Sequence, residues 1–155
     1  MIGAAVGEIG RFVRIEAVSS LFETAPMYVE DQDAYVNAAM IGEWDGGPIA
    51  LVSRLKEVEK SLGRMERIRF GPREIDLDLL MFGSLWLVSE NSSVPIQVPH
   101  ARISERRFVL APLAEIAPNM ELPGLGKVSE LLLQTEEQAN TVVKMSHAPL
   151  SIHGN

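Results

Sequence analysis

The sequence predicts an α+β domain whose sheet is mostly antiparallel and flanked by helices. Residues 48–62 carry apolar side chains at helical spacing, whereas several shorter segments alternate apolar and polar residues. The two kinds of segment follow each other irregularly along the chain, which is typical of this class. With 155 residues, 46% of them hydrophobic, the chain has enough apolar material for one core. We therefore expect a single domain over residues 1–155.

Composition excludes several classes of protein. A net charge of −7 argues against a general nucleic-acid or anionic-membrane surface, which needs a broadly basic face. The absence of cysteine excludes disulfides, thiol nucleophiles and thiolate metal sites. No apolar run is long enough to span a membrane, and no signal peptide is indicated. We expect a cytoplasmic protein that binds small molecules, and take a monomer as the starting expectation.

The first third of the chain predicts strands around a polar loop. Apolar and polar residues alternate before and after this loop, and a residue that precedes proline is biased away from the helix. Residues 1–10, which are small and apolar, are either the tail of a helix or a frayed start. The expected elements are a strand over 12–18, an extended stretch over 21–26, a polar loop over 30–34 and a β-compatible run over 35–44 that pairs antiparallel with the earlier segment.

The best-supported helix covers residues 48–62. Pro48 suits its first turn, and Gly63 is expected to end it as the C′ residue. An arginine-rich loop then follows up to residue 73. Glu59 lies one turn before Arg64, so it either faces this loop or forms a surface salt bridge, and the sequence leaves both interpretations open.

Residues 75–82 are predicted to form a strand that carries two carboxylates on one face. The period of two places Asp76 and Asp78 together, with their Cα atoms roughly 6.5 Å apart in an extended chain. Two like charges beside a hydrophobic sheet are costly unless a cation neutralises them. Mg²⁺ or Mn²⁺, held by one or two carboxylates and by substrate phosphates, suits this pair. The alternative is that both acids merely solvate an edge strand.

The arginines before this segment favour a binding site over a solvated surface. Between residues 64 and 73 the chain has four arginines and one acid, Glu66, which gives a local charge of +3 in an acidic protein. Such a block suits a polyanionic ligand, and because the positive charge is local we expect that ligand to be small. The four residues are Arg64, Arg67, Arg69 and Arg73.

The remainder of the chain is predicted to alternate short elements with loops. Pro112 lies inside an apolar segment at 108–116, so any helix there is expected to start near this proline or to be broken by it. The other expected elements are a return strand over 85–88, an irregular stretch over 90–99, a loop over 119–126, a helix over 127–138, a final strand over 141–145 and a flexible tail over 146–155.

The chain resembles the 6-hydroxymethyl-7,8-dihydropterin pyrophosphokinase family of folate biosynthesis, approximately from Val18 to Leu133. The resemblance implies a ferredoxin-like fold and transfer of a pyrophosphoryl group from ATP to the hydroxymethyl oxygen of the pterin, with release of AMP. The stretch G-P-R-x-x-D-x-D-L-L is long and specific, and the other motifs occur in the family's order. They are SSLFETAP (19–26), DQDAYVNA (31–38), EVEKSLGR (57–64), FGPREIDLDLLMFG (70–83), VPH (98–100), RRFVLAPLAEIAP (106–118) and LPG (122–124).

The resemblance also implies roles for individual residues. Asp76 and Asp78 correspond to ligands of two Mg²⁺ ions and, together with Arg64 and Arg73, to the catalytic group. Planar arginine side chains suit a triphosphate, and two aromatic planes suit a flat bicyclic ring. The implied ATP-binding residues are Glu59, Arg64, Arg67, Arg69, Arg73, His100 and Arg106, and the implied pterin-binding residues are Thr24, Pro26, Tyr35, Asn37, Phe70 and Phe108.

The chain departs from the family's pattern in four places. Ala25, Lys56 and Ala101 replace residue types that are frequent in the family, which affects fine contacts to the ligands. The family's first strand, of the type A-L-G-S-N-L-G, and most of its first helix do not appear. A start assigned too late, a truncation, or replacement of that strand by residues 141–152 would each explain this.

Two other functions stay open on the sequence alone. One is a degenerate, non-catalytic nucleotide-binding module, and the other is a different two-metal, ferredoxin-like nucleotide enzyme, such as a cyclase or a phosphodiesterase.

Overall fold

The computed structural model describes residues 1–25, 35–70, 75–90 and 94–145, and for residues 64–70 it describes the backbone alone. The chain divides into two compact units. Of the described residues, unit 1 comprises 1–15 and 42–101, and unit 2 comprises 16–41 and 102–145. The single-domain organisation stays a prediction, and the predicted tail at 146–155 lies outside the described residues.

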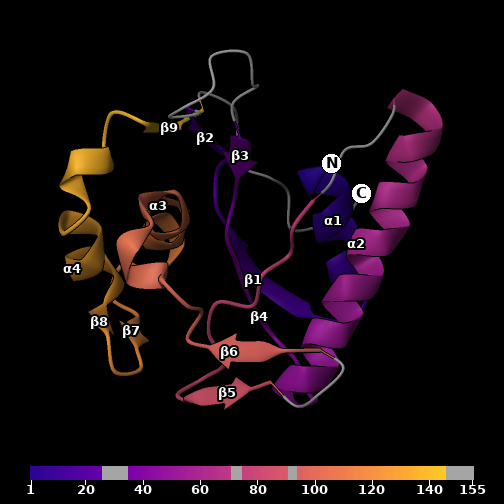
Figure 1. The fold of residues 1–155 in the computed structure, drawn as a ribbon, viewed down its shortest axis with the longest axis horizontal. Coiled ribbons are helices and arrows are strands. Elements are labelled where there is room, and N and C mark those ends of the chain that lie inside the picture. The colour runs from indigo at the N-terminus through magenta and orange to yellow at the C-terminus, as the bar shows by residue number, and fades with distance from the viewer. Residues whose placement is uncertain (26–34, 71–74, 91–93, 146–155) are drawn as a thin grey trace. The chain divides into compact units, whose positions relative to one another are not determined.

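Unit 1 contains two helices that lie side by side, α1 (Ile2–Ile9) and α2 (Pro48–Phe70) (Figure 1). For residues 1–10, the helical alternative is therefore confirmed. Ala5 of α1 packs with Val58 and Leu62 of α2 in one apolar cluster. Most of the apolar stripe predicted for α2 is buried, namely Leu51, Val52, Leu55, Val58 and Leu62. Its first member, Ile49, is 40% exposed.

The prediction that Gly63 ends α2 is wrong. The helix continues to Phe70, so residues 64–70 are helical and do not belong to a loop. A glycine inside a helix costs only about 1 kcal/mol relative to alanine, and arginine, methionine and glutamate are good helix formers. The first proline after Gly63 is Pro72, so nothing before it forces the helix to stop. Residues 71–74 lie outside the described part of the chain.

The strand predicted over residues 75–82 is also wrong, because this segment has no ladder partner in the described chain. The predicted return strand forms as β5 (Leu87–Ser89), but its antiparallel partner is β6 (Ile96–Val98). Part of the stretch expected to be irregular is therefore a strand. The backbone of residues 75–82 instead forms hydrogen bonds with the side chain of Glu59 and the amide of His100.

Unit 2 contains a three-stranded sheet in the order β3-β2-β9 (Figure 1). Its central strand β2 (Phe22–Thr24) pairs antiparallel with β3 (Tyr35–Asn37) and with β9 (Val142–Lys144). The predicted antiparallel pairing across the polar loop and the predicted final strand are therefore confirmed. Because β9 pairs with β2, residues 142–144 belong to this sheet. Replacement of the family's first strand by residues 141–152 stays a prediction, since residues 146–152 lie outside the described part of the chain.

The chain crosses from one unit to the other within two strands, β1 (Arg14–Val18) and β4 (Met40–Glu43). β1 pairs with β4, and the division between units falls within each of them. Gly42 is needed in this ladder, since a Cβ there would lie 2.5 Å from Cγ1 of Val13 and 2.9 Å from the carbonyl oxygen of Arg14. Strands were expected in both places.

Helix α3 (Arg107–Ile116) runs through Pro112, contrary to the expectation that this proline would start or break it. The proline lacks an N–H, so the helix forgoes one hydrogen bond, but Leu110, Pro112 and Leu113 are all buried and their packing offsets this loss. The 3-10 turn η1 (Ile103–Glu105) precedes α3.

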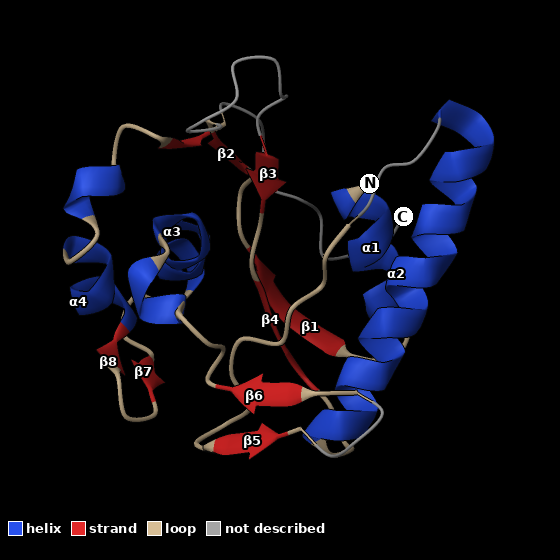
Figure 2. Cartoon of the chain, in the orientation of Figure 1, coloured by secondary structure: helices blue, strands red, loops and turns tan. Residues whose placement is uncertain are grey.

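The last part of unit 2 forms small elements around a hairpin. β7 (Glu121–Leu122) and β8 (Gly126–Lys127) pair within the expected loop, and α4 (Val128–Leu133) follows directly (Figure 2). The predicted helix over 127–138 is thus shorter, and the 3-10 turn η2 (Glu136–Gln138) completes that stretch. The fold is α+β and ferredoxin-like, with antiparallel strand pairs and helices, as predicted. None of the helices in the described residues is long and apolar enough to cross a membrane.

Candidate functional site

Asp76 and Asp78 are both exposed, although the segment that carries them is not a strand. Their neighbours Ile75, Leu77 and Leu79 are partly buried, so the alternation expected from the sequence persists. In the described residues neither carboxylate has a hydrogen bond or an ion pair with another group. The two acids are therefore presented to solvent from the same side of the segment.

The buried side of this segment anchors it to unit 1. Ile75 and Leu77 pack against the cluster of Ala5, Val58 and Leu62. Leu79 and Phe82 pack against a second cluster, which consists of Val52, Ile96 and Val98. Helix α2 contributes to both clusters, so the aspartates are held by apolar contacts to this helix and to β6.

Two hydrogen bonds hold the backbone of residues 75–82, which has no strand partner in the described chain. The amide of Leu77, the residue between the two aspartates, donates to Oε2 of Glu59 at 2.6 Å. Glu59 is also paired with Lys56, whose Nζ lies 3.2 Å from Oε1. Two residues after Asp78, the carbonyl of Leu80 accepts from the amide of His100 at 2.8 Å.

Glu59 therefore forms the salt bridge that one interpretation predicted, and in addition it accepts a backbone hydrogen bond that the sequence did not indicate. Its contact with ATP stays a prediction. His100 is half-buried, and its Nδ1 lies 2.8 Å from the carbonyl oxygen of Ala101. Because a carbonyl only accepts, this contact requires a proton on Nδ1 and leaves Nε2 available for another partner.

The pterin-binding residues predicted in the strands of unit 2 share one face of a sheet. In the ladder, Thr24 lies opposite Tyr35, and Phe22 lies opposite Asn37. Side chains directly opposite each other point to the same side, and so do those two residues apart on one strand. Thr24, Tyr35 and Asn37 are therefore brought together, as the resemblance implies.

This face of the sheet is turned toward α3, the helix that carries Phe108. Phe22 and Val142 on this face are buried. Lys144 lies opposite Phe22, and its Nζ is 2.8 Å from Oε2 of Glu115 on α3. The sheet and the helix thus bring residues from four distant parts of the sequence into one unit.

Thr24 has a buried hydroxyl without a partner. Its Oγ1 is inaccessible to solvent and makes no hydrogen bond within the described residues. A buried hydroxyl that lacks a partner costs roughly 1–3 kcal/mol. Such an atom on the predicted ring-binding face suits a ligand that supplies the missing hydrogen bond.

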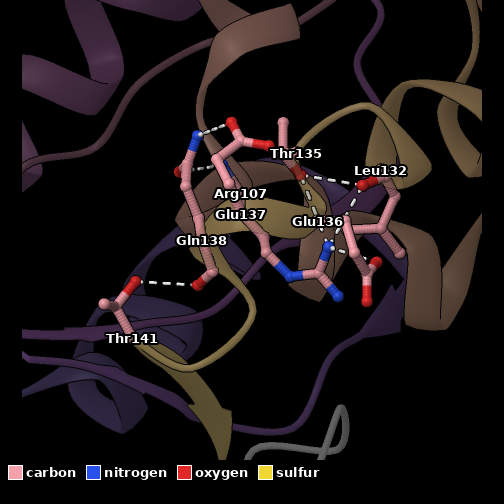
Figure 3. Close-up of polar contacts among 7 residues, drawn as sticks. All are labelled: Arg107, Leu132, Thr135, Glu136, Glu137, Gln138 and Thr141. Carbon is pink, nitrogen blue, oxygen red and sulfur yellow. Dashed lines mark hydrogen bonds and ion pairs between the residues drawn. The ribbon is translucent and has the colours of Figure 1, made fainter.

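Arg106 and Arg107 have different environments, although they are adjacent. The guanidinium of Arg107 points into a group of acceptors between α3 and the end of α4, where Nη1 lies 3.1 Å from the carbonyl oxygen of Leu132 and 3.6 Å from Glu136 (Figure 3). Its Nη1 also approaches Oγ1 of Thr135 at 3.5 Å. Arg107 is therefore structural.

The side chain of Arg106 makes no hydrogen bond or ion pair within the described residues. Its Cζ lies 5.7 Å from the centroid of the Phe108 ring. A free cation beside an aromatic ring suits a phosphate and a flat ring bound next to each other. This is the combination that the resemblance implies for Arg106 and Phe108.

Two buried serines and Glu115 hold this part of unit 2 together. Oγ of Ser19 accepts from the amide of Ala39 at 2.8 Å, and Oε1 of Glu115 accepts from the amide of Ser20 at 2.6 Å. Partial burial raises the pKa of Glu115, but the hydrogen bonds from Lys144 and Ser20 outweigh it, and the net pKa is lowered. The carboxylate thus stays ionised and links α3 to β2 and β9.

Several predicted site residues cannot be placed. For four of them the structure describes only the backbone, which is part of α2: Arg64, Arg67, Arg69 and Phe70. Arg73 and Pro26 lie outside the described residues altogether. The roles assigned to these six residues stay predictions.

The aspartates fit a hard divalent cation. Both supply oxygen ligands, both are exposed, and neither is paired within the described residues. The described part of the chain has no group of three or more acidic, histidine or cysteine side chains that could enclose a metal by themselves. This donor set therefore suits Mg²⁺, which is commonly bound by one or two carboxylates, water and substrate phosphates.

Sequence reasoning predicted a salt bridge for Glu59 as one alternative but did not name its partner. Lys56 and Glu59 have the helical spacing i, i+3, which could have indicated this ion pair. Nothing in the sequence indicated that Glu59 also binds the Leu77 amide, or that Arg107 and Glu115 are structural.

The chain matches a known protein family and several named relatives. The family model described as 7,8-dihydro-6-hydroxymethylpterin-pyrophosphokinase matches residues 1–118. The 2-amino-4-hydroxy-6-hydroxymethyldihydropteridine pyrophosphokinase of Bacillus subtilis is 40% identical over 109 residues, which are 70% of this chain and 63% of that protein. The enzyme of the same name from Pseudomonas aeruginosa is 38% identical over 120 residues, covering 77% of this chain and 71% of that protein.

A longer relative matches as well. The mitochondrial folate synthesis bifunctional protein of Pisum sativum is 44% identical over 104 residues, which are 67% of this chain. The chain spans 19% of the length of that plant protein and 63% of the length of the Bacillus protein. The family match covers more than half of the chain and includes both aspartates. The chain therefore belongs to the 7,8-dihydro-6-hydroxymethylpterin-pyrophosphokinase family.

Proposed function

We propose that this protein transfers pyrophosphate from ATP to 6-hydroxymethyl-7,8-dihydropterin, giving the pterin diphosphate and AMP. The observation that carries this proposal is the exposure of Asp76 and Asp78 on the same side of one segment, in a chain of this family. Two neighbouring carboxylates that have no counter-charge among the described residues suit metal ions that also bind a triphosphate.

The phosphate tail of ATP is assigned to charged residues. In unit 1, Asp76 and Asp78 hold two Mg²⁺ ions, and Nε2 of His100 contacts the nucleotide. Bound Mg²⁺ supplies positive charge that neutralises the oxygens of the reacting β-phosphoryl group. In unit 2, Arg106 provides a further cation. Further contacts to the nucleotide are assigned to Glu59, Arg64, Arg67, Arg69 and Arg73.

The pterin is assigned to the sheet face of unit 2 and to two aromatic planes. Thr24, Tyr35 and Asn37 supply polar groups for the edge of the ring, and the unpartnered hydroxyl of Thr24 supports this assignment. Phe70 and Phe108 stack on the two faces of the ring, and Pro26 lines the binding loop.

The chemical step forms a bond between the hydroxymethyl oxygen and the β-phosphorus, while the bond between this phosphorus and the AMP oxygen breaks and the hydroxyl loses its proton. Little covalent chemistry falls to the protein in this step. Its residues act by orienting both substrates and by stabilising negative charge.

The product distinguishes this function from the two alternatives. Purified protein is incubated with ATP, Mg²⁺ and 6-hydroxymethyl-7,8-dihydropterin, and the nucleotides are separated by chromatography. We expect AMP and pterin diphosphate in equal amounts, and no AMP without the pterin. A cyclic nucleotide or free phosphate would identify another two-metal enzyme, and ATP binding without turnover would identify a non-catalytic module. Two expectations of the sequence also remain proposals: a cytoplasmic location and a monomeric state.

A further inference from the structure

The aspartate segment has an unusual connection to helix α2. Leu77 contacts this helix twice, because its side chain packs against Val58 and Leu62 and its amide donates to Glu59. At 2.6 Å, the bond is short, and it joins an amide to a charged acceptor, which makes it stronger than a bond between neutral groups.

The bonded amide belongs to the peptide unit that links Asp76 to Leu77. A hydrogen bond to this amide restrains the plane of the peptide unit and therefore the direction in which the Asp76 side chain leaves the backbone. The side chain of Leu77 restrains the opposite side of the segment. Together, these contacts keep both aspartates on the exposed side, although the segment has no neighbouring strand in the described part of the chain.

Lys56 completes the arrangement. Its Nζ lies 3.2 Å from Oε1 and 3.4 Å from Oε2 of Glu59, and the Glu59 side chain is only 16% exposed. The lysine offsets the cost of placing the Glu59 carboxylate against a segment that already carries two carboxylates.

We propose that Glu59, held in place by Lys56, is a positioning residue that orients Asp76 and Asp78 for metal binding. This inference rests on the proposed function only in its assignment of the two aspartates as ligands. Glu59 acts through the Leu77 amide and touches neither the metal nor the substrates in this role.

The first test measures the hydrogen bond itself. Amide hydrogen exchange at Leu77 is followed by NMR in the protein without ligands, for the original protein and for Glu59→Ala, Glu59→Gln and Glu57→Gln. We expect exchange at Leu77 to be faster on the order of 10- to 100-fold in Glu59→Ala, since a bond to a charged acceptor is lost. Glu59→Gln retains an acceptor and should show a smaller increase.

Glu57→Gln is the matched control, because Glu57 is on the same helix, is 72% exposed and pairs only with Arg54 in the described residues. It removes the same charge and should leave Leu77 unchanged. If Glu59→Ala does not change exchange at Leu77, the proposed restraint is absent and the inference is overturned.

The second test measures metal binding without turnover. Free Mn²⁺ is quantified by electron paramagnetic resonance during titration of each variant saturated with α,β-methylene-ATP, whose bridging carbon prevents the transfer. Relative to Glu57→Gln, we expect Mn²⁺ to bind about tenfold more weakly to Glu59→Ala and a few-fold more weakly to Glu59→Gln and Lys56→Gln.

If Glu59→Ala does not fold, Mn²⁺ binding is compared in Glu59→Gln, Lys56→Gln and the control Glu57→Gln. Mn²⁺ binding as tight as in the control, in every folded variant, would mean that Glu59 stabilises the fold only, and it would overturn the inference. Weaker Mn²⁺ binding in a protein that forms no AMP would support the positioning role while contradicting the proposed function, so the two failures are distinguishable.

Discussion

The two units present their parts of the candidate site in different ways. In unit 1, Asp76 and Asp78 are two residues apart on one short segment, and side chains hold that segment without a ladder. In unit 2, Thr24, Asn37 and Phe108 come from two strands and a helix and are assembled by strand register and packing. Two metal ligands on one segment are placed by the conformation of that segment alone. A surface that binds a flat ring requires residues from several helices and strands. The two parts should therefore respond differently to mutation.

The largest expected effect is on turnover, from the aspartates. Asp76→Ala and Asp78→Ala should each lower kcat by roughly a thousandfold or more, because each loses a ligand that is worth several kcal/mol in the transition state. Both residues are exposed, so thermal unfolding should be almost unchanged. Asp45→Ala, at another exposed acid of unit 1, is the control and should retain activity. Near-normal turnover of either aspartate variant at saturating Mg²⁺ would contradict the metal assignment.

The adjacent arginines should separate stability from substrate binding. Arg107→Ala removes the contacts to Leu132 and Thr135, and it should lower the free energy of unfolding by about 1.5–3 kcal/mol, measured by urea denaturation. Arg106→Ala should leave this free energy within about 0.5 kcal/mol of the original and raise the KM for ATP. Equal losses of stability in the two variants would show that Arg106 is structural as well.

Thr24→Val tests whether unit 2 sacrifices stability for ligand binding. Removing a buried hydroxyl that lacks a partner should raise the free energy of unfolding by about 1 kcal/mol, while weakening pterin binding roughly five- to tenfold. Calorimetry of both processes checks this. Thr141→Val is a matched contrast, because its Oγ1 donates to the carbonyl of Gln138 at 2.8 Å and its loss should destabilise. Destabilisation by Thr24→Val would mean that its hydroxyl is already satisfied.

The smallest expected effect concerns pH. The pKa of Glu115 is lowered in the folded protein, so the ionised form is favoured by folding. The resulting stabilisation is fully present above the unfolded pKa, near 4.5, and is lost as the pH falls through the lower folded value. Urea denaturation between pH 7 and pH 3 should therefore show a steeper loss in the original protein than in Glu115→Gln. The same substitution at the exposed Glu121 should not change the profile, and identical profiles for Glu115→Gln and the original would contradict this account.

Local pattern was sufficient for much of the fold. The stripe of α2 followed from spacing, and the pairing of β2 with β3 followed from two extended segments around a polar loop. The end of α2 was missed because Gly63 is a weak stop signal when good helix formers follow it. The strand predicted over 75–82 is wrong because a strand requires a partner, and alternation on one segment does not show whether a partner exists.

By itself, the sequence determined the family, the presence of the paired acids and the side on which they lie, because spacing of two along an extended chain sets direction without any other element. Only the tertiary structure decided which of the charged side chains that it describes form hydrogen bonds or ion pairs with one another. The sequence does not show that Arg107 binds the carbonyl of Leu132 while the adjacent Arg106 does not. It also does not show which acid of α2 accepts from the amide of Leu77; the structure identifies Glu59. Such differences depend on atoms that are far apart in the chain, and these meet only when packing brings their elements together.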